Sequence, residues 1–165
     1  MSIQIAIVTI SDSAAAGTRE DRSGPALEQR AAELGWTIAH RALVPDDRTL
    51  IAKTVANLSH LDLILTTGGT GLAPRDVTPE AIKMIAEREV PGFGEVMRAQ
   101  GLKSTEYAPL SRGGAVTRGS SLIVMLPGSP RGAIESLNAV CGLIPHVVDL
   151  LHGRTEHKEK LGASS

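Results

Sequence analysis

The 165-residue sequence predicts an α/β fold with a mostly parallel sheet and helices on both of its faces. One reason is that short aliphatic, β-branched runs alternate with longer segments whose apolar residues follow a helical spacing. Another is that loops rich in glycine and polar residues follow these runs. Right-handed crossovers bring such loops to one edge of the sheet, where ligands of open α/β sheets bind. The pattern therefore also locates the functional site.

The first half of the chain contains three predicted strands. Residues 3–10 are a near-continuous β-branched run, which indicates a strand buried on both faces. Residues 11–23 are small and polar and predict a loop, after which Pro25 opens a helix that Gly35 closes. The remaining elements expected here are a strand over 37–44, a helix capped by Asp46 or Asp47 that carries Leu50 to Leu58, and a strand over 61–65.

The second half is expected to contain a helix over 81–88, a short helix over 92–100, strands over 114–118 and 121–126, and a helix that starts at Ser129-Pro130. A tight turn at Gly119-Ser120 joins the two strands, so one of them must run antiparallel. The last helix is interrupted at Gly142 and resumes past Pro145. Residues 156–165 show no periodicity. We expect a single domain over 1–153 and a flexible tail over 154–165.

Composition excludes several classes of function. The net charge of −1 gives no basic field for nucleic acid or an anionic membrane, and one Trp, one Tyr and one Phe are too few for base stacking. No apolar stretch approaches the roughly 20 residues that span a bilayer. The single cysteine, Cys141, is expected in the core and permits no internal disulfide. We expect a cytoplasmic protein without a nucleic-acid or membrane partner.

The most informative stretch is TTGGTGLAPRDVTPE, at residues 66–80. Its three glycines in four positions, Gly68, Gly69 and Gly71, let backbone N–H groups approach an anion with no Cβ in the way. The stretch lacks the GK[ST] ending of a P-loop and the last glycine of a dinucleotide fingerprint. A tight turn before a capped helix is the structural alternative to a phosphate site.

Charged residues within the stretch favour the phosphate site. Arg75 supplies a cation for phosphate and Asp76 a carboxylate for a metal ion, which nucleotidyl transfer needs and a turn does not. Thr78 is a natural N-cap and Pro79 fits the first helical position. We therefore expect the N-terminus of the following helix to face the bound phosphate.

Other polar residues are expected at the same edge of the sheet. Gly128 and Ser129 precede a proline and start a helix; beside the first loop they become a second phosphate or hydroxyl contact. Asp46 and Asp47 are candidates for a helix cap or for metal ligands. Asp12 is a candidate for ordering its loop or for contacting a nucleotide.

The run GGTG followed by PRDVTPE resembles the signature of the molybdopterin adenylyltransferase family, the Mog/MoaB-like proteins of molybdenum-cofactor biosynthesis. Further motifs resemble the family in the same order along residues 4–150: TISD at 9–12, VPDD at 44–47, EVPGF at 89–93, LSRG at 110–113 and LPGSP at 126–130. Several motifs in order are more specific than any one of them.

The resemblance implies a three-layer α/β/α sandwich with a mostly parallel mixed sheet, the molybdopterin-binding fold. It implies an enzyme that uses ATP and Mg²⁺ to adenylylate the phosphate of molybdopterin and releases pyrophosphate. It also implies a homotrimer, with a hexamer as the alternative assembly, and a molybdate-insertion protein as a downstream partner. Because the chain ends soon after the last matching helix, no attached insertion domain is expected.

The resemblance also assigns residues to roles. Asp76 and Asp46 become candidates for catalysis and for metal binding, with Glu80 as a further catalytic candidate. The substrate-binding residues it implies are Asp12, Thr67, Gly68, Gly69, Thr70, Gly71, Arg75, Ser111, Gly128 and Ser129.

A different class of function remains open. A noncatalytic molybdopterin-binding or scaffold protein would keep the glycines but could dispense with the carboxylates. Asp46, Asp47, Asp76 and Glu80 favour the enzyme. A nucleotide hydrolase or deamidase would rest on analogy of fold alone.

Overall fold

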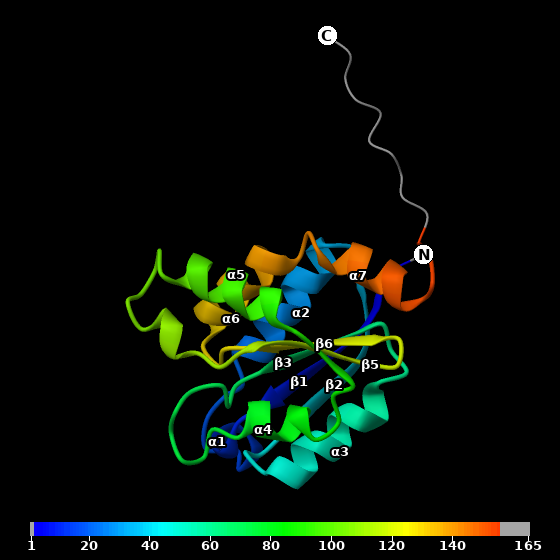
Figure 1. Ribbon diagram of the computed structural model, residues 1–165. Helices are drawn as coiled ribbons and strands as arrows, with labels where there is room; N and C mark the ends of the chain where they lie inside the picture. Colours follow the sequence, from blue (N-terminus) through cyan, green and yellow to red (C-terminus); the bar gives the residue numbers. More distant parts are fainter. Residues whose placement is uncertain (1, 156–165) are drawn as a thin grey trace.

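The computed structural model describes residues 2–155, and the expected tail residues 156–165 lie outside them. Within the described residues a six-stranded sheet has the order β2-β1-β3-β6-β5-β4 (Figure 1). Strands β1, β2, β3 and β6 are parallel, whereas β5 runs antiparallel to both β6 and β4. The strands are β1 (Gln4–Ile10), β2 (Thr37–Val44), β3 (Leu63–Thr67), β4 (Arg88–Val90), β5 (Gly114–Arg118) and β6 (Ser121–Leu126).

Helices cover both faces of this sheet. Helices α2, α5, α6 and α7 lie on one face, and α3 and α4 lie on the other (Figure 1). The predicted α/β/α sandwich with a mostly parallel mixed sheet is thereby confirmed. The helical elements of the described chain are α1 (Asp12–Ala15), α2 (Ser23–Glu33), α3 (Arg48–Leu58), α4 (Thr78–Lys83), α5 (Pro91–Gly101), the 3-10 helix η1 (Ala108–Leu110), α6 (Pro130–Val140) and α7 (Ile144–Leu151).

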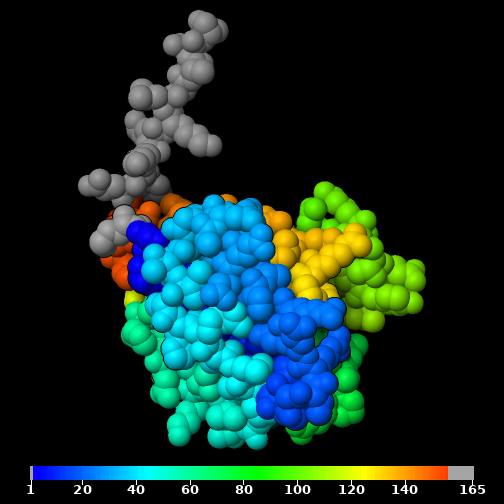
Figure 2. All heavy atoms as spheres, turned by 180° about the vertical axis from the view of Figure 1, so that it is seen from behind, coloured from blue at the N-terminus to red at the C-terminus, as the bar shows by residue number. Residues whose placement is uncertain are grey.

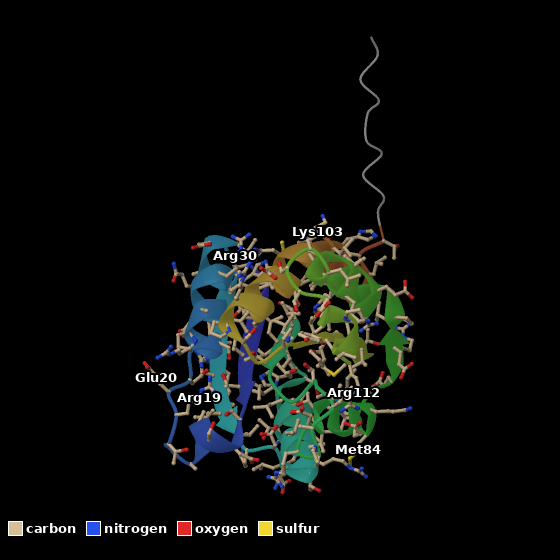
Figure 3. All side chains as sticks on the ribbon, turned by 90° about the vertical axis from the view of Figure 1, so that its left-hand side faces the viewer. Arg19, Glu20, Arg30, Met84, Lys103 and Arg112 are labelled. Carbon is tan, nitrogen blue, oxygen red and sulfur yellow. The ribbon has the colours of Figure 1, made fainter. Side chains whose placement is uncertain are left out.

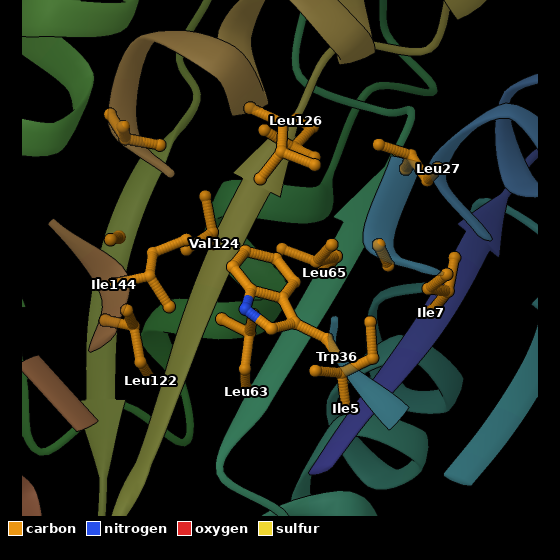
Figure 4. Packing of buried hydrophobic residues seen from close by; sticks show 14 of the residues in the cluster. Ile5, Ile7, Leu27, Trp36, Leu63, Leu65, Leu122, Val124, Leu126 and Ile144 are labelled. Atoms are coloured by element: carbon orange, nitrogen blue, oxygen red, sulfur yellow. The ribbon is translucent and has the colours of Figure 1, made fainter. Parts of the chain in front are cut away.

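The central strand β1 is buried on both faces, as its continuous apolar run predicts. Ile5 and Ile7 point into the core beneath α2 and α6, while Ala6 and Val8 point into the core beneath α3 and α4. All four are fully buried, and burying a large aliphatic side chain contributes about 1.5–3 kcal/mol. Trp36 lies among the aliphatic side chains of the first core (Figure 4).

Local signals predict several helix ends correctly. Of the two aspartates proposed as caps for α3, Asp47 is the one used: its carboxylate accepts from the N–H of Leu50 at 2.8 Å. The hydroxyl of Ser129 caps α6 by accepting from the N–H of Gly132 at 3.0 Å. Gly119, with a φ of 55°, forms the turn between β5 and β6. These features depend only on neighbours in the sequence.

Three predicted elements differ from the structure. The expected loop over 11–23 contains α1, whose N-cap is Ser11, and it ends where α2 begins at Ser23. The expected helix over 81–88 stops at Lys83, because the backbone N–H of Glu87 bonds to the carbonyl of Thr117 and residues 88–90 pair with β5. Strand β3 starts and ends two residues later than the predicted range 61–65. Pairing of residues 88–90 with β5, which is distant in the sequence, therefore overrides the helical pattern predicted up to residue 88.

Cys141, expected in the core, is only half-buried. It lies at the C-cap of α6, where the chain turns before α7, and it packs against the core from its margin. No single helix of residues 2–155 is long and apolar enough to cross a membrane; α6 and α7 meet that measure only as a bent pair. Side chains of both helices are packed into the core of the sheet.

The four parallel strands end at one edge of the sheet. In the ladders Ile10 pairs with Val44, and Thr67 pairs with both Thr9 and Leu126. The loops that follow β1, β2, β3 and β6 therefore start at the same level. From behind, α6 lies beside α2, and the segment after α5 projects past α6 (Figure 2).

Candidate functional site

A cavity of about 440 Å³ opens at this edge of the sheet, between the four loops. We call it the first cavity. The hydroxyl of Thr67 donates to the carbonyl of Pro127 at 2.7 Å and joins the loops after β3 and β6 at its floor. The predicted site residues that line it are Asp46, Thr67, Gly68, Gly69, Asp76, Gly128 and Ser129. Residues predicted from separate motifs are thus brought together.

Gly68 and Gly69 adopt a backbone that other residues rarely take. Their φ angles are 108° and 69°, and a Cβ on Gly68 would collide with the carbonyl oxygen of Ile10. A Cβ on Gly69 would collide with the hydroxyl of Thr78, which donates to the carbonyl of Gly68 at 2.8 Å. Thr78 therefore does not cap α4, and Val77 occupies the N-cap position.

The sequence predicts that the N-terminus of α4 faces the cavity, but the N-termini of two other helices line it. Neither Thr78 nor Pro79 lines the first cavity. Ser23, the first residue of α2, and Ser129 and Pro130, at the start of α6, line it instead. An N-terminus carries partial positive charge, so α6, with 11 residues, directs a favourable potential for anions into this space.

Asp12 and Asp46 hold the loops after β1 and β2 together. The backbone N–H of Asp12 donates to the carboxylate of Asp46 at 2.9 Å, and the N–H of Asp46 donates to the carboxylate of Asp12 at 3.0 Å. Arg75 donates to both carboxylate oxygens of Asp12, at 2.9 Å each, and lowers the pKa of that carboxyl. Arg75 thus binds Asp12 and does not line the first cavity.

Asp46 and Asp76 present carboxylates to the first cavity. Burial raises the pKa of Asp46, and the nearby charges of Asp12 and Asp76 raise it further. The carboxylate of Asp76 accepts from the N–H of Ala73 at 3.0 Å, which holds it within its own turn. This arrangement places negative charge, partly removed from water, beside a cavity that a cation can enter.

Three other predicted residues lie behind the first cavity. The carbonyls of Thr70 and Gly71 accept from Arg112, and Glu80 forms an ion pair with the same guanidinium. None of the three lines the first cavity. Sequence reasoning assigned Arg112 no role beyond its place in a matching motif.

A second cavity of about 210 Å³ adjoins the first, and Ser129 lines both. Ser111, a predicted substrate contact, lines the second cavity together with Met97, Tyr107 and Pro127. Its wall is therefore more apolar than that of the first cavity.

Sequence reasoning placed the loop between α1 and α2 at this edge but assigned no role to its two arginines. Arg19 and Arg22 line the first cavity. Arg19 and Arg112 lie on opposite sides of the view in Figure 3. The loop is fixed by Asp21, whose carboxylate accepts from the hydroxyl of Thr9 at 2.8 Å and from Arg41 at 3.0 Å. The available signal is position alone: these arginines follow a strand that ends at the functional edge.

The chain matches the family profile described as "Probable molybdopterin binding domain" over residues 6–146. It is 43% identical to the molybdopterin adenylyltransferase of Helicobacter pylori strain J99, covering 92% of this chain and 89% of that protein. The crystal structure of the molybdopterin biosynthesis enzyme MoaB from Thermus thermophilus superposes with a TM-score of 0.85 at 47% identity, covering 92% and 97% of the two chains. The tungsten cofactor synthesizing protein MoaB from Pyrococcus furiosus superposes with a TM-score of 0.80 at 35% identity, covering 93% and 98%.

The backbone at Gly69 gives a prediction for stability. Gly69→Ala should lower the free energy of unfolding by more than about 2 kcal/mol, because the new Cβ adds a collision with Thr78 to the penalty of a positive φ. Gly35→Ala is the matched control: its φ of 79° is similar, but nothing lies within 4 Å of its Cβ position. Urea unfolding compares the two, and equal losses would contradict a packing constraint at Gly69.

The raised pKa of Asp46 predicts a pH-dependent gain of stability in Asp46→Asn. Because folding raises this pKa, the ionised carboxyl destabilises the fold above the folded-state pKa, and the penalty vanishes as the pH falls below the ordinary value of 3.8. In chelator-containing buffer the variant should be more stable than the parent at pH 7, and the gain should shrink toward acidic pH. Urea unfolding between pH 7 and pH 4 measures it.

Asp47→Asn is the control for that series. Asn caps a helix as well as Asp does, so its stability should change by no more than about 0.5 kcal/mol at either pH. A loss of stability in Asp46→Asn at pH 7 would show that the carboxylate is not strained by burial.

Proposed function

The chain belongs to the molybdopterin-binding domain family, and from this we propose that it transfers AMP from ATP to the phosphate of molybdopterin. The observation that carries the proposal is the pair of adjoining cavities, one bordered by carboxylates and glycines and the other more apolar, with Ser129 on both. Relatives that match 92% of the chain are named molybdopterin adenylyltransferases.

ATP is proposed to occupy the first cavity. Its volume of about 440 Å³ falls within the range of small-molecule sites. The phosphates would lie against Gly68 and Gly69 and near the start of α6, where the helix dipole favours an anion. Arg19 and Arg22 would supply the positive charge that sequence reasoning assigned to Arg75.

Molybdopterin is proposed to occupy the second cavity. Met97, Tyr107 and Pro127 offer an apolar surface for a flat ring, and Ser111 offers a hydroxyl to its polar edge. The molybdopterin phosphate would then reach toward Ser129, where the two cavities meet. Two substrates bound on either side of one residue are aligned for reaction.

Asp46 and Asp76 are proposed to hold Mg²⁺. The raised pKa of Asp46 reflects a desolvated carboxyl, and a cation would relieve its repulsion with Asp76. Among residues 2–155 no cluster of three or more His, Cys, Asp or Glu side chains forms a complete metal site. Two carboxylates suit Mg²⁺, which keeps several waters and binds phosphate oxygens. When bound, the ion neutralises charge on the phosphates.

The proposed reaction is a displacement at the α-phosphorus of ATP. An oxygen of the molybdopterin phosphate forms the new P–O bond, the bond to the β-phosphate breaks, and its electron pair leaves with pyrophosphate. Such a transfer asks the protein mainly to position two anions and stabilise their charge. The glycines, the α6 N-terminus and the arginines do this without a covalent intermediate.

A noncatalytic molybdopterin-binding or scaffold protein is the second candidate. The observation that favours it is that Arg75 and Glu80 are engaged with Asp12 and Arg112 and do not line the first cavity. Incubation with molybdopterin, ATP and Mg²⁺ separates the two candidates. The enzyme yields adenylylated molybdopterin and pyrophosphate, whereas a scaffold binds the pterin and yields neither.

The proposal includes the setting of the enzyme. We propose a cytoplasmic protein with a single domain over 1–153 that passes its product to a molybdate-insertion protein. The single cysteine, which permits no internal disulfide, and the near-zero net charge support this setting.

Asp76→Asn should separate chemistry from binding. The change keeps the shape of the side chain and removes the charge proposed to hold Mg²⁺, so AMP transfer should fall by at least about 10²-fold. Binding of molybdopterin should persist, because removal of a negative charge does not repel an anion. Adenylylation rates and a pterin titration on one preparation measure both quantities.

Asp149→Asn is the control, since Asp149 pairs with Arg154 on the surface. Its rate should match that of the parent. Near-normal turnover in Asp76→Asn would remove this residue from the proposed metal site and leave Asp46.

The proposed assembly is a homotrimer, with a hexamer as the alternative. Closed cyclic symmetry is common among soluble homo-oligomers. Light scattering should give three times the 17.3 kDa mass of the chain, or six times for the hexamer. A stable monomer at micromolar concentration contradicts this part of the proposal.

A further inference from the structure

Arg112 contacts the glycine-rich loop through three nitrogens and Glu80 of α4 through a fourth. Its backbone N–H donates to the carbonyl of Thr70 at 2.8 Å, and its Nε donates to the carbonyl of Gly71 at 2.9 Å. One terminal nitrogen, Nη2, donates to the carbonyl of Asp76 at 2.8 Å, and the other, Nη1, forms the ion pair with Glu80. The guanidinium thus bonds to both ends of the turn over 71–76.

Apart from the ion pair of Arg75 with Asp12, this turn has few contacts of its own. Its residues 72–75 are exposed, and within it the N–H of Asp76 donates to the carbonyl of Ala73 while the N–H of Ala73 donates to the carboxylate of Asp76. The position of the Asp76 carboxylate therefore follows the position of the Asp76 backbone. Arg112 fixes that backbone directly.

Glu80 is placed to hold Arg112. Arg112 lowers the pKa of this carboxyl through their hydrogen bond. The second oxygen of Glu80, Oε2, is buried without a hydrogen-bond partner in the described structure. One oxygen of the Glu80 carboxylate binds Arg112 and the other is buried, so this carboxylate is not presented to the first cavity.

The segment that carries Arg112 is itself anchored. Arg98 of α5 donates to the carbonyls of Ser111 and Gly113 at 3.3 and 2.8 Å. Ser111 lines the second cavity, while Arg112 holds the loop at the first. Adjacent residues of one fixed segment therefore serve the two cavities.

We propose that Arg112 is a positioning residue that holds Asp76 toward the first cavity, and that Glu80 holds Arg112 and takes no part in the chemistry. The inference deepens the proposed adenylyl transfer and rests on it. A planar guanidinium is required because three acceptors in different directions need three different nitrogens, which lysine does not have.

The first experiment measures the loop without any ligand. Amide hydrogen exchange in the turn over 71–76 should become about tenfold faster in Arg112→Gln, on the scale of a lost hydrogen bond. Arg112→Lys should behave like Arg112→Gln. Arg118→Gln is the matched control: Arg118 donates to the carbonyl of Ile85 at 2.9 Å, outside the turn, and should leave its exchange unchanged. Thermal unfolding confirms that each variant is folded.

The second experiment measures AMP transfer. Arg112→Gln should lower kcat by at least about tenfold, as expected for a disturbed placement of a catalytic group, with the KM for molybdopterin nearly unchanged. In the Asp76→Asn background the same change should lower kcat less than about threefold, because the group it positions is already absent. Arg118→Gln should keep the parental rate.

Glu80→Gln tests the role of the carboxylate and is the milder variant if Arg112→Gln does not fold. The amide oxygen still accepts from Arg112, so kcat should fall by less than about tenfold, whereas loss of a general base or metal ligand would lower it by about 10²-fold or more.

Several outcomes overturn the proposal: unchanged exchange in Arg112→Gln, full rescue by lysine, additive effects with Asp76→Asn, or a loss of about 10²-fold in Glu80→Gln. If the parent protein makes no adenylylated product, the proposed function fails. Hydrogen exchange still decides in that case whether Arg112 positions Asp76.

Discussion

The site depends on how closely the loop after β3 crosses the ends of its neighbours. Gly68 passes over the carbonyl of Ile10 where no Cβ fits, and a Cβ on Gly128 would stand 3.2 Å from the Cα of Gly68. The N–H of Gly68 donates to Leu126 at 3.1 Å and its carbonyl accepts from Thr78, so the crossing leaves neither backbone group of Gly68 unpaired. The loops after β1, β3 and β6 are therefore drawn to one cavity.

Drawing the loops together concentrates negative charge. Asp12 and Asp46 each satisfy the other's backbone N–H, which places two carboxylates side by side, and Arg75 neutralises Asp12 through a direct ion pair. The remaining charge on Asp46 and Asp76 would repel a phosphate. The chain as a whole carries only −1, so this repulsion is local and a bound cation can reverse it. The same close packing that shapes the cavity thus leaves two carboxylates beside it, which is why the proposed function includes Mg²⁺.

The sequence predicts features that depend on neighbouring residues and misses those set by distant ones. The apolar run of β1 and the cap at Ser129 follow from local pattern, and the structure shows both. Strand β4 has only three residues, too few to show a periodicity in the sequence, and it forms by pairing with the distant β5. Arg75 and Arg112 are chemically alike, yet sequence reasoning linked only Arg75 to the glycines. Which arginine reaches which acceptor is decided by the folded chain.

The direction of β5 explains why Arg112 reaches the site at all. Loops that follow parallel strands arrive at the functional edge by the ordinary rule for α/β sheets. Because β5 runs antiparallel, its first residue, Gly114, pairs with Met125 near the end of β6, so the segment before β5 lies at that same edge. Ser111, which lines the second cavity, and Arg112, which holds the loop at the first, thereby reach this edge from the opposite chain direction. The segment before this one antiparallel strand supplies Ser111 and Gly113 to the wall of the second cavity, which a purely parallel sheet would lack beside the first.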